Sequence, residues 1–282
     1  MSTLPEGFTF SQSSLQDYKD CQRRFELRYL LQLAWPAIES EPARENERLM
    51  QQGARFHQLV HKYILGLSTQ QLSNQIHDPD LRRWWDNFLA SFNSTPGLVK
   101  NPVELYPEVS LTASLADFRI VAKCDLIAID RDSRLIIFDW KTSQKPPQRE
   151  WLRQRLQTRL YPYILVQSGA YLLNGEPVMP NQVEMVYWYA EDPHSPVRFP
   201  YTEQQNQSDG VFLSGLIKQI QQHQLGEFHR TQHEERCRYC IYRSLCDRGV
   251  TAGPVTESDS DYSQAESFEI QIDLERVRDI EY

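Results

Sequence analysis

Two short stretches in the middle of the chain, residues 122–125 (AKCD) and residues 138–142 (FDWKT), decide how the sequence is interpreted. Side chains alternate along a β-strand, so Asp139 and Lys141 project from the same face of one strand. Between the stretches, residues 130–133 (DRDS) have the composition of a hairpin turn. Asp125 then lies on the preceding strand, close in register to Asp139. Two carboxylates and one ammonium at a strand end predict a hard-cation site, which suits Mg²⁺ or Mn²⁺ better than Zn²⁺.

Such a site has a definite chemical use. A bound metal ion would polarise a phosphodiester and activate water, while Lys141 would orient that water or offset charge in the transition state. The alternative is a surface hairpin on which Asp139 and Lys141 form an ordinary exposed ion pair. An Asp-x-Lys pattern often arises by chance, so the catalytic interpretation depends on the residues that accompany it.

The regions around these stretches predict an α/β fold. Apolar periodicity indicates helices at residues 11–31, 47–67 and 80–92, with a loop at residues 35–45. Strands are predicted at residues 103–115, 118–129, 134–140, 182–190 and 196–202. Two more helices are predicted, one at residues 148–173 with a kink at Pro162 and one at residues 209–224. This order of helices, three strands, helix and strand predicts a mixed central sheet.

Two further patterns accompany the acidic strand pair. Residues 53–57 (GARFH) place His57 on the second predicted helix, and residues 157–161 (QTRLY) place Gln157 and Tyr161 on one face of the long helix. In this order, the patterns resemble the RecB-like branch of the PD-(D/E)XK nuclease superfamily, marked by Gly-x-x-x-His, Asp, Asp-x-Lys and Gln-x-x-x-Tyr. The resemblance covers about residues 53–190. It implies a restriction-endonuclease-like αβββαβ core within about residues 47–202, preceded by N-terminal helices and followed by a C-terminal cysteine-cluster extension.

The resemblance also implies a role for each matching residue. Asp125 and Asp139 would hold a Mg²⁺ or Mn²⁺ ion, with His57 and the backbone carbonyl of Trp140 as further ligands. Lys141 would be the catalytic lysine. Gln157 and Tyr161 would contact DNA or brace the site.

Three other positions bear on this assignment. Ala122 stands where the family often has a glycine, a mild departure that leaves the acids in place. Glu108 is a candidate extra acid, but a solvent-facing strand residue is favoured. His61 lies one helical turn after His57 and is a candidate second ligand, but a surface histidine or one behind the ligands is favoured.

The cysteines suggest a second metal centre. Cys237, Cys240 and Cys246 form a Cys-x₂-Cys-x₅-Cys pattern, and Cys21 stands alone on the first predicted helix. One distant and three clustered thiols suit a four-ligand centre that joins the two ends of the chain. The arrangement resembles the iron–sulfur staple of AddB-type nucleases and of CRISPR-associated adaptation nucleases, which implies a [4Fe–4S] cluster on these four residues. Zn²⁺ is the alternative, and Cys124 is predicted to be a small buried residue.

The net charge of −8 is unevenly distributed. Residues 250–282 contain nine acidic and two basic residues, a net charge of −7, which leaves −1 for residues 1–249. Residues 141–161 contain six basic residues and one acidic residue, a local charge of +5. This segment predicts nucleic-acid contacts at Arg153 and Arg159, on a basic face with Lys145 and Arg149. Residues 250–282 are predicted to form an acidic, mostly disordered tail with a candidate strand at residues 268–274.

The remaining properties limit the function further. The 282 residues predict one domain, at residues 1–249, whose ends are joined by the cysteine cluster. No apolar run approaches the roughly 20 residues that span a bilayer, and residues 1–14 lack signal-peptide features, so a cytoplasmic protein is expected. The sequence has no Gly-x-x-x-x-Gly-Lys-Ser/Thr phosphate loop, so strand separation would need a separate helicase.

The expected function is therefore a Mg²⁺- or Mn²⁺-dependent DNA nuclease, an exonuclease on ends or single strands, in DNA repair or recombination. Two alternatives from other classes remain open. One is a non-cleaving nucleic-acid-binding module of the same fold. The other is an interaction scaffold stapled by Zn²⁺.

Overall fold

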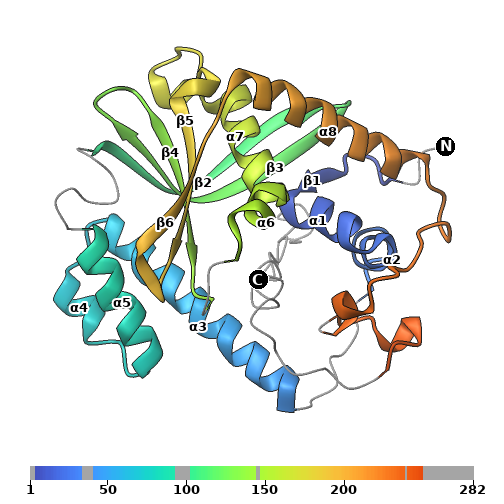
Figure 1. Ribbon diagram of the computed structural model, residues 1–282, viewed down its shortest axis with the longest axis horizontal. Helices are drawn as coiled ribbons and strands as arrows, with labels where there is room; N and C mark the ends of the chain where they lie inside the picture. Colours follow the sequence, from blue (N-terminus) through green and yellow to red (C-terminus); the bar gives the residue numbers. More distant parts are fainter. Residues whose placement is uncertain (1–3, 34–40, 93–101, 144–146, 239, 250–282) are drawn as a thin grey trace, which may run out of the picture.

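The computed structural model describes residues 4–33, 41–92, 102–143, 147–238 and 240–249, and its centre is one six-stranded mixed sheet (Figure 1). The strands are β1 (Thr9–Ser11), β2 (Pro102–Leu115), β3 (Phe118–Asp130), β4 (Leu135–Lys141), β5 (Val183–Tyr189) and β6 (Asp192–Pro200). Their order is β1-β3-β4-β5-β6, with β2 also paired to β3. The β1–β3 and β4–β5 pairs are parallel and the others are antiparallel. The predicted mixed α/β fold is confirmed.

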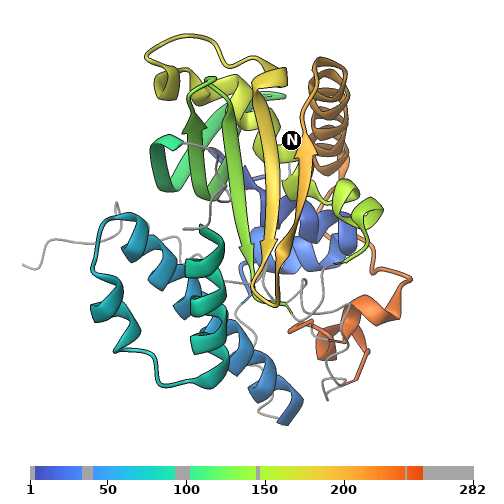
Figure 2. The ribbon, with the colours of Figure 1, turned by 60° about the vertical axis from the view of Figure 1, so that its left-hand side comes forward.

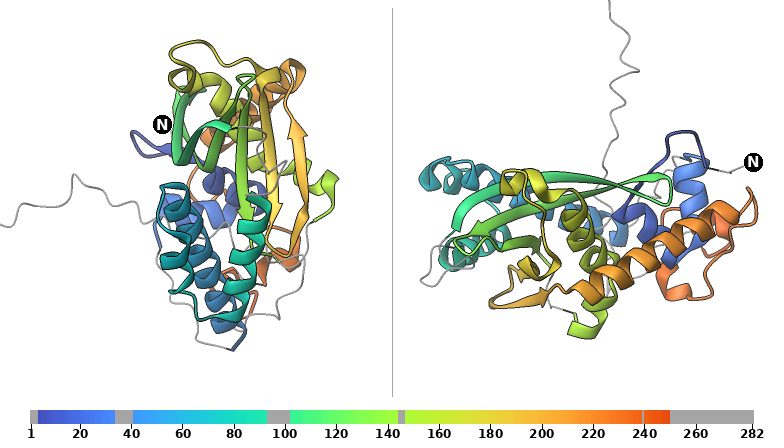
Figure 3. Two further views of the ribbon diagram at one scale, coloured as in Figure 1. Left: turned by 90° about the vertical axis from the view of Figure 1, so that its left-hand side faces the viewer. Right: turned by 90° about the horizontal axis from the view of Figure 1, so that it is seen from above.

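Helices cover both faces of the sheet, because the central strands are apolar on both sides. On β3 and β4, Ile127 and Ile137 contribute to one core cluster, whereas Leu126 and Phe138 contribute to the other. The first cluster lies under α1 (Gln12–Asp20), α7 (Leu156–Ser168) and α8 (Glu203–Gln222). The second lies under α3 (Glu41–Ile64), α4 (Thr69–Ser73) and α5 (Pro79–Phe92). Figures 2 and 3 show these two groups of helices around the sheet.

The predicted helix at residues 11–31 is broken, which corrects the sequence-based expectation. It consists of β1, α1, α2 (Gln22–Phe25) and a π-helix, η1 (Glu26–Leu30). The break is at Cys21, whose backbone is extended with φ −159° and ψ 107°. Buried ion pairs span this break, because Arg24 lies 2.8 Å from Asp17 and 3.3 Å from Asp20. Periodicity alone gives no sign of this interruption.

The long predicted helix at residues 148–173 is also divided, but not where a kink was expected. It forms α6 (Arg149–Gln154), α7 and a 3₁₀ segment, η2 (Gly169–Leu173), and the interruption is at Arg155 while α7 continues through Pro162. The new helix start is supported from a distance, because Leu156 N donates to Gln16 Oε1 on α1 at 3.4 Å. A contact across 140 residues explains why local sequence did not reveal the break.

Other boundaries differ by a few residues. Helix α3 begins at Glu41, inside the predicted loop, and α8 begins at Glu203, where Thr202 caps it by accepting from Gln205 N at 3.2 Å. Three more 3₁₀ segments are η3 (Pro180–Gln182), η4 (Glu234–Cys237) and η5 (Ser244–Cys246). The predicted acidic tail at residues 250–282 and Lys145 lie outside the described residues. No helix in the described part of the chain is long and apolar enough to cross a membrane.

Candidate active site and cysteine cavity

The two predicted acids lie where neighbouring strands separate. Strand β3 pairs with β4 up to Leu126 opposite Phe138, so Asp125 and Asp139 are the next residues on their strands. Beyond this point β4 continues beside β5 as far as Lys141. The start of β3, at residues 119–121, pairs with β1 instead. The sheet therefore forks at the two carboxylates.

Asp125 is fixed from two directions. Its Oδ2 accepts a hydrogen bond from Trp140 N at 2.9 Å, and its Oδ1 lies 3.2 Å from His57 Nδ1. His57 is held in place by the preceding residue, Phe56, which is fully buried and stacks on Trp188 with ring centroids 6.0 Å apart. Helix α3 thus brings the imidazole to the fork.

Helix α3 can approach the end of β4 because Gly53 has no side chain. A Cβ at Gly53 would lie 3.1 Å from Thr142 Oγ1, which is tight for a Cβ contact. The glycine of the GARFH stretch therefore has a packing role, one helical turn before His57.

Asp139 and Lys141 project together as predicted, and helix α7 completes the group. Lys141 Nζ lies 3.0 Å from Asp139 Oδ2 and 3.3 Å from Gln157 Oε1. Gln157 Nε2 donates to Asp139 Oδ1 and lies 3.4 Å from the Tyr161 hydroxyl. One amide side chain therefore contacts the acid, the base and the tyrosine.

Burial and charge act on the acids in opposite ways. Burial raises the pKa of Asp139 to about 6, against the lowering effect of Lys141 and with a contribution from Asp125. Burial also acts to raise the pKa of Asp125, but the charge and hydrogen bond of His57 and the Trp140 N–H hold it below its ordinary value. For His57, burial would lower the pKa, and Asp125 more than reverses this. The fork thus pairs an ionised acid with one that resists ionisation.

The donor set fits a divalent cation. Asp139 Oδ2 is buried and is ion-paired with Lys141 at 3.0 Å. Two carboxylates and one imidazole are ligand types that Mg²⁺ or Mn²⁺ accepts. Among the described residues, however, no three His, Cys, Asp or Glu side chains are already gathered as metal ligands.

The other predicted residues lie outside this group of contacts. Glu108 pairs with Lys123 at 2.6 Å and has a φ of 54°. Arg153 is exposed, 3.6 Å from Glu150. Arg159 is engaged with buried Asp209. His61 is half-buried on α3.

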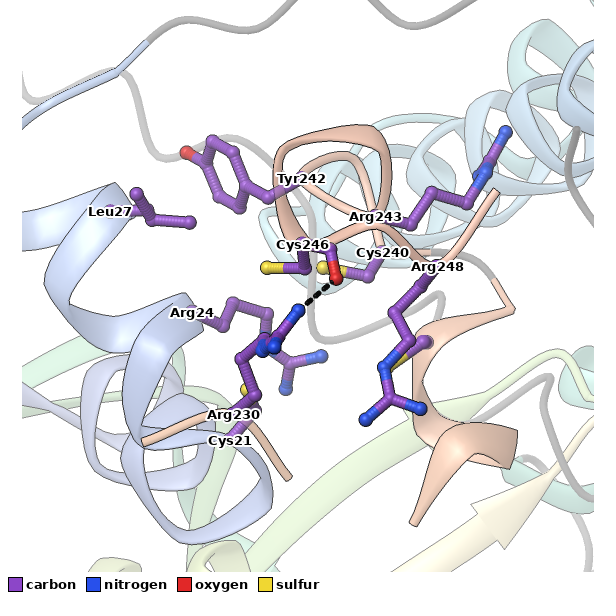
Figure 4. A pocket seen from close by; sticks show the side chains of 10 residues that line it. Cys21, Arg24, Leu27, Arg230, Cys240, Tyr242, Arg243, Cys246 and Arg248 are labelled. Atoms are coloured by element: carbon purple, nitrogen blue, oxygen red, sulfur yellow. Dashed lines mark hydrogen bonds between the residues drawn. The ribbon is translucent and has the colours of Figure 1, made fainter. Parts of the chain in front are cut away.

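The four predicted cluster cysteines line one cavity between the first helices and the end of the described chain (Figure 4). In the figure, Cys21 lies on one side of the cavity and Cys240 and Cys246 lie on the other. Cys21 contributes, after burial, to raising the pKa of both Cys237 and Cys246, which places these thiols close together. Cys124 is fully buried in the core, away from this cavity.

The cavity has a feature that the sequence analysis missed. Among the described residues, its lining has no Asp or Glu and four arginines, of which Arg24 is paired with Asp17 and Asp20 behind it: Arg24, Arg230, Arg243 and Arg248. A cationic lining suits an anionic group such as a thiolate-ligated cluster. Three of the arginines are within three residues of a cysteine, which was the available signal.

Hydrogen bonds join the chain segments on both sides of the cavity. Arg23 N donates to His229 O at 3.0 Å, and the Tyr242 hydroxyl donates to Leu33 O at 2.8 Å. Gly226 N donates to the buried Glu26 side chain. The N-terminal helices are therefore hydrogen-bonded to residues about 200 positions later in the chain.

Comparisons with known proteins bear on the family and the fold. A family model described as the PD-(D/E)XK nuclease superfamily matches residues 9–247. A solved structure of a protein from Eubacterium rectale, provisionally assigned as an exonuclease, is similar with 12% identity and a TM-score of 0.51, covering 89% of this chain and 92% of that one. The structure of the protein SSO0001 matches with 13% identity and a TM-score of 0.37, covering 86% of each chain. No curated protein matches the chain.

Proposed function

This chain belongs to the PD-(D/E)XK nuclease superfamily, and we propose that it hydrolyses phosphodiester bonds in DNA with Mg²⁺ or Mn²⁺. The observation that carries the proposal is the contact of Asp139, Lys141 and Gln157 at the sheet fork, beside Asp125 and His57. The family match extends over this whole region.

In the proposed mechanism, Asp125, Asp139, His57 and the Trp140 carbonyl would hold the cation. When bound, the cation would polarise the scissile phosphate. Asp125 is oriented for this task by the Trp140 N–H.

Lys141 has a separate part. Its contacts with Asp139 and Gln157 fix the ammonium at the fork, where it can donate to an attacking water or to a phosphate oxygen. Gln157 holds the lysine and the acid in register, and Tyr161 supports Gln157 from the same face of α7. Burial of Lys141 and Asp139 strengthens these electrostatic contacts by excluding water.

We further propose that the substrate is a DNA end or a single strand, in DNA repair or recombination. The protein from Eubacterium rectale is provisionally assigned as an exonuclease, and the chain has no phosphate loop for a motor of its own. A separate helicase would then supply single strands, and the expected location is the cytoplasm.

We propose that Cys21, Cys237, Cys240 and Cys246 hold a [4Fe–4S] cluster. The shared cavity and its arginine lining support this assignment. Thiolates around one Zn²⁺ lie about 4 Å apart, because each Zn–S bond is about 2.3 Å long. One Zn²⁺ on the same four thiolates is the alternative to the cluster. Iron, sulfide and zinc analysis of protein purified without oxygen tests this choice.

The nuclease proposal is tested with labelled single-stranded DNA and added Mn²⁺. The wild-type protein is expected to cleave, and the variants Asp139→Ala and Lys141→Ala are expected to be inactive while still folded. Wild-type cleavage by both variants would refute the assigned site. Binding without cleavage by the wild-type protein would favour the non-cleaving module.

A further inference from the structure

A cleft of about 570 Å³ lies outside the proposed active site, between α1, the α6–α7 junction and the start of α8. Its lining contains basic and neutral polar side chains with one acid: Lys19, Arg153, Gln154, Arg159, Thr202, Gln204, Gln205, Ser208 and Asp209. Arg159 on its wall and Gln157 in the active site are two residues apart on α7. Since two residues turn a helix by about 200°, the cleft and the active site lie on opposite faces of α7.

The positive charge of this cleft is only partly compensated. Asp209 is buried and pairs with Arg159 at 2.5 Å, so it neutralises that arginine. Lys19 forms no ion pair with a carboxylate of the described residues; its Nζ donates to the Gln154 carbonyl at 3.0 Å. Arg153 meets only the exposed Glu150, at 3.6 Å, a weak surface pair. Burial lowers the pKa of Lys19; the charge of Asp20 acts against this, and the charges of Arg159, Arg155 and Arg236 act with it.

Aromatic rings hold several of these cations in position. The Arg159 guanidinium lies 3.7 Å from the centroid of Phe212, and Lys19 Nζ lies 5.9 Å from the same ring. Arg149 and Arg153 lie 4.5 and 6.0 Å from the centroid of Phe199. These ring faces carry cations, so they are not stacking platforms for bases. The cleft therefore presents ammonium, guanidinium, amide and hydroxyl donors, which can hydrogen-bond to the oxygens of a phosphate and its sugar.

We propose that this cleft binds a backbone phosphate of the DNA strand that is cut at the active site. The proposal rests on the proposed nuclease function and deepens it. Arg153, on the wall of the cleft, is twelve residues after Lys141, so at most about 43 Å of chain separates the two residues. The strand would run from the fork over α6 to the cleft, held by its phosphates independently of base sequence.

The test is binding of fluorescent single strands without divalent metal, so that no cleavage occurs. The Lys19→Gln/Arg153→Gln double variant is expected to bind a strand of about 20 nucleotides more weakly than the wild type, and a strand of about 6 nucleotides equally well. Because the proposal places one phosphate in the cleft, the double variant is expected to reduce the slope of log K against log salt by about 0.7. The melting temperature is measured alongside, because Lys19 Nζ also donates to the Gln154 carbonyl; Arg153→Gln alone, at an exposed side chain, should leave it unchanged.

The matched control is Lys218→Gln, an exposed lysine on α8 outside the cleft, which should leave the affinity and salt slope unchanged. Unchanged binding of the long strand by the double variant would overturn the proposal. Loss of inorganic phosphate binding with unchanged strand binding would assign the cleft to a free anion and also overturn it. Absence of strand binding by the wild type would instead overturn the nuclease function on which the proposal rests.

Discussion

Replacement of Asp139 by asparagine should make the protein more stable at neutral and higher pH while abolishing cleavage. Asparagine resembles the neutral form of the carboxyl group and keeps one oxygen, which can accept from either Gln157 Nε2 or Lys141 Nζ. The wild-type acid must ionise in a buried position, where its side chain is 8% exposed. The site would therefore maintain a destabilising charge that its chemistry needs.

The magnitude follows from the pKa of Asp139, which burial raises from 3.8 to about 6. A pKa that is higher in the folded protein means that the protonated form favours folding. Its contribution is complete below about pH 4 and is lost as the pH rises through 6. About two pH units correspond to roughly 3 kcal/mol. The Asp139→Asn variant is not subject to this loss, so it should exceed the wild type by up to this amount at about pH 8.

The assay is urea unfolding in metal-free buffer at about pH 4 and about pH 8. Titrating groups away from the fork cancel in the difference between the two proteins, which therefore reports Asp139 together with its neighbours Asp125, His57 and Lys141. Asp130→Asn is the opposite control, because the Arg134 side chain and two backbone N–H groups hold the pKa of buried Asp130 below its ordinary value against the effect of burial. That variant should lose stability at pH 8. A gain for Asp139→Asn that does not depend on pH would refute the reasoning, as would a loss at pH 8.

Three further predictions concern single contacts. Lys141→Met should reduce single-turnover cleavage with Mn²⁺ by about 10²-fold or more, because the ammonium at the fork is lost; a smaller effect would remove it from the chemistry. Gly53→Ala should lower cleavage, because the new Cβ meets Thr142 and displaces α3, and it should change the unfolding free energy by less than about 3 kcal/mol. Unchanged cleavage would show that α3 can move aside without affecting the site. Cys21→Ser should lose iron and melt early, whereas Cys124→Ser should keep both iron and cleavage; full iron retention by Cys21→Ser would remove that residue from the ligand set.

The part of the site that could be predicted from sequence is the part encoded by short spacings. Asp139 and Lys141 are two residues apart on a strand, and Gln157 and Tyr161 are four apart on a helix, so periodicity brings each pair together. The contact of His57 with Asp125 spans 68 residues and required the family resemblance. The sequence predicts a contact correctly where the period of a single strand or helix brings the two side chains together.

The failures have the opposite origin. The break between α6 and α7 depends on Gln16, far away on α1. Arg159, predicted to bind DNA, is committed to Asp209, 50 residues later. No local pattern announces a partner at such a distance, so helix ends and the availability of a charged side chain were the least predictable features.

The closure of the first helices by the end of the described chain has a consequence for biosynthesis. Residues 57–161, which supply the fork, leave the ribosome well before residues 226–246, which complete the surroundings of Glu26 and Cys21. Between Cys21 and Cys246 lie 225 positions (246 − 21), which take about 11 to 45 s to translate at 5–20 residues per second. During this interval the N-terminal helices lack the contacts that residues 226–246 later supply. The contacts around Cys21 and Glu26 can therefore form only after residue 246 has been synthesised. A chain released before residue 246 would contain all the residues of the fork but could not complete these contacts.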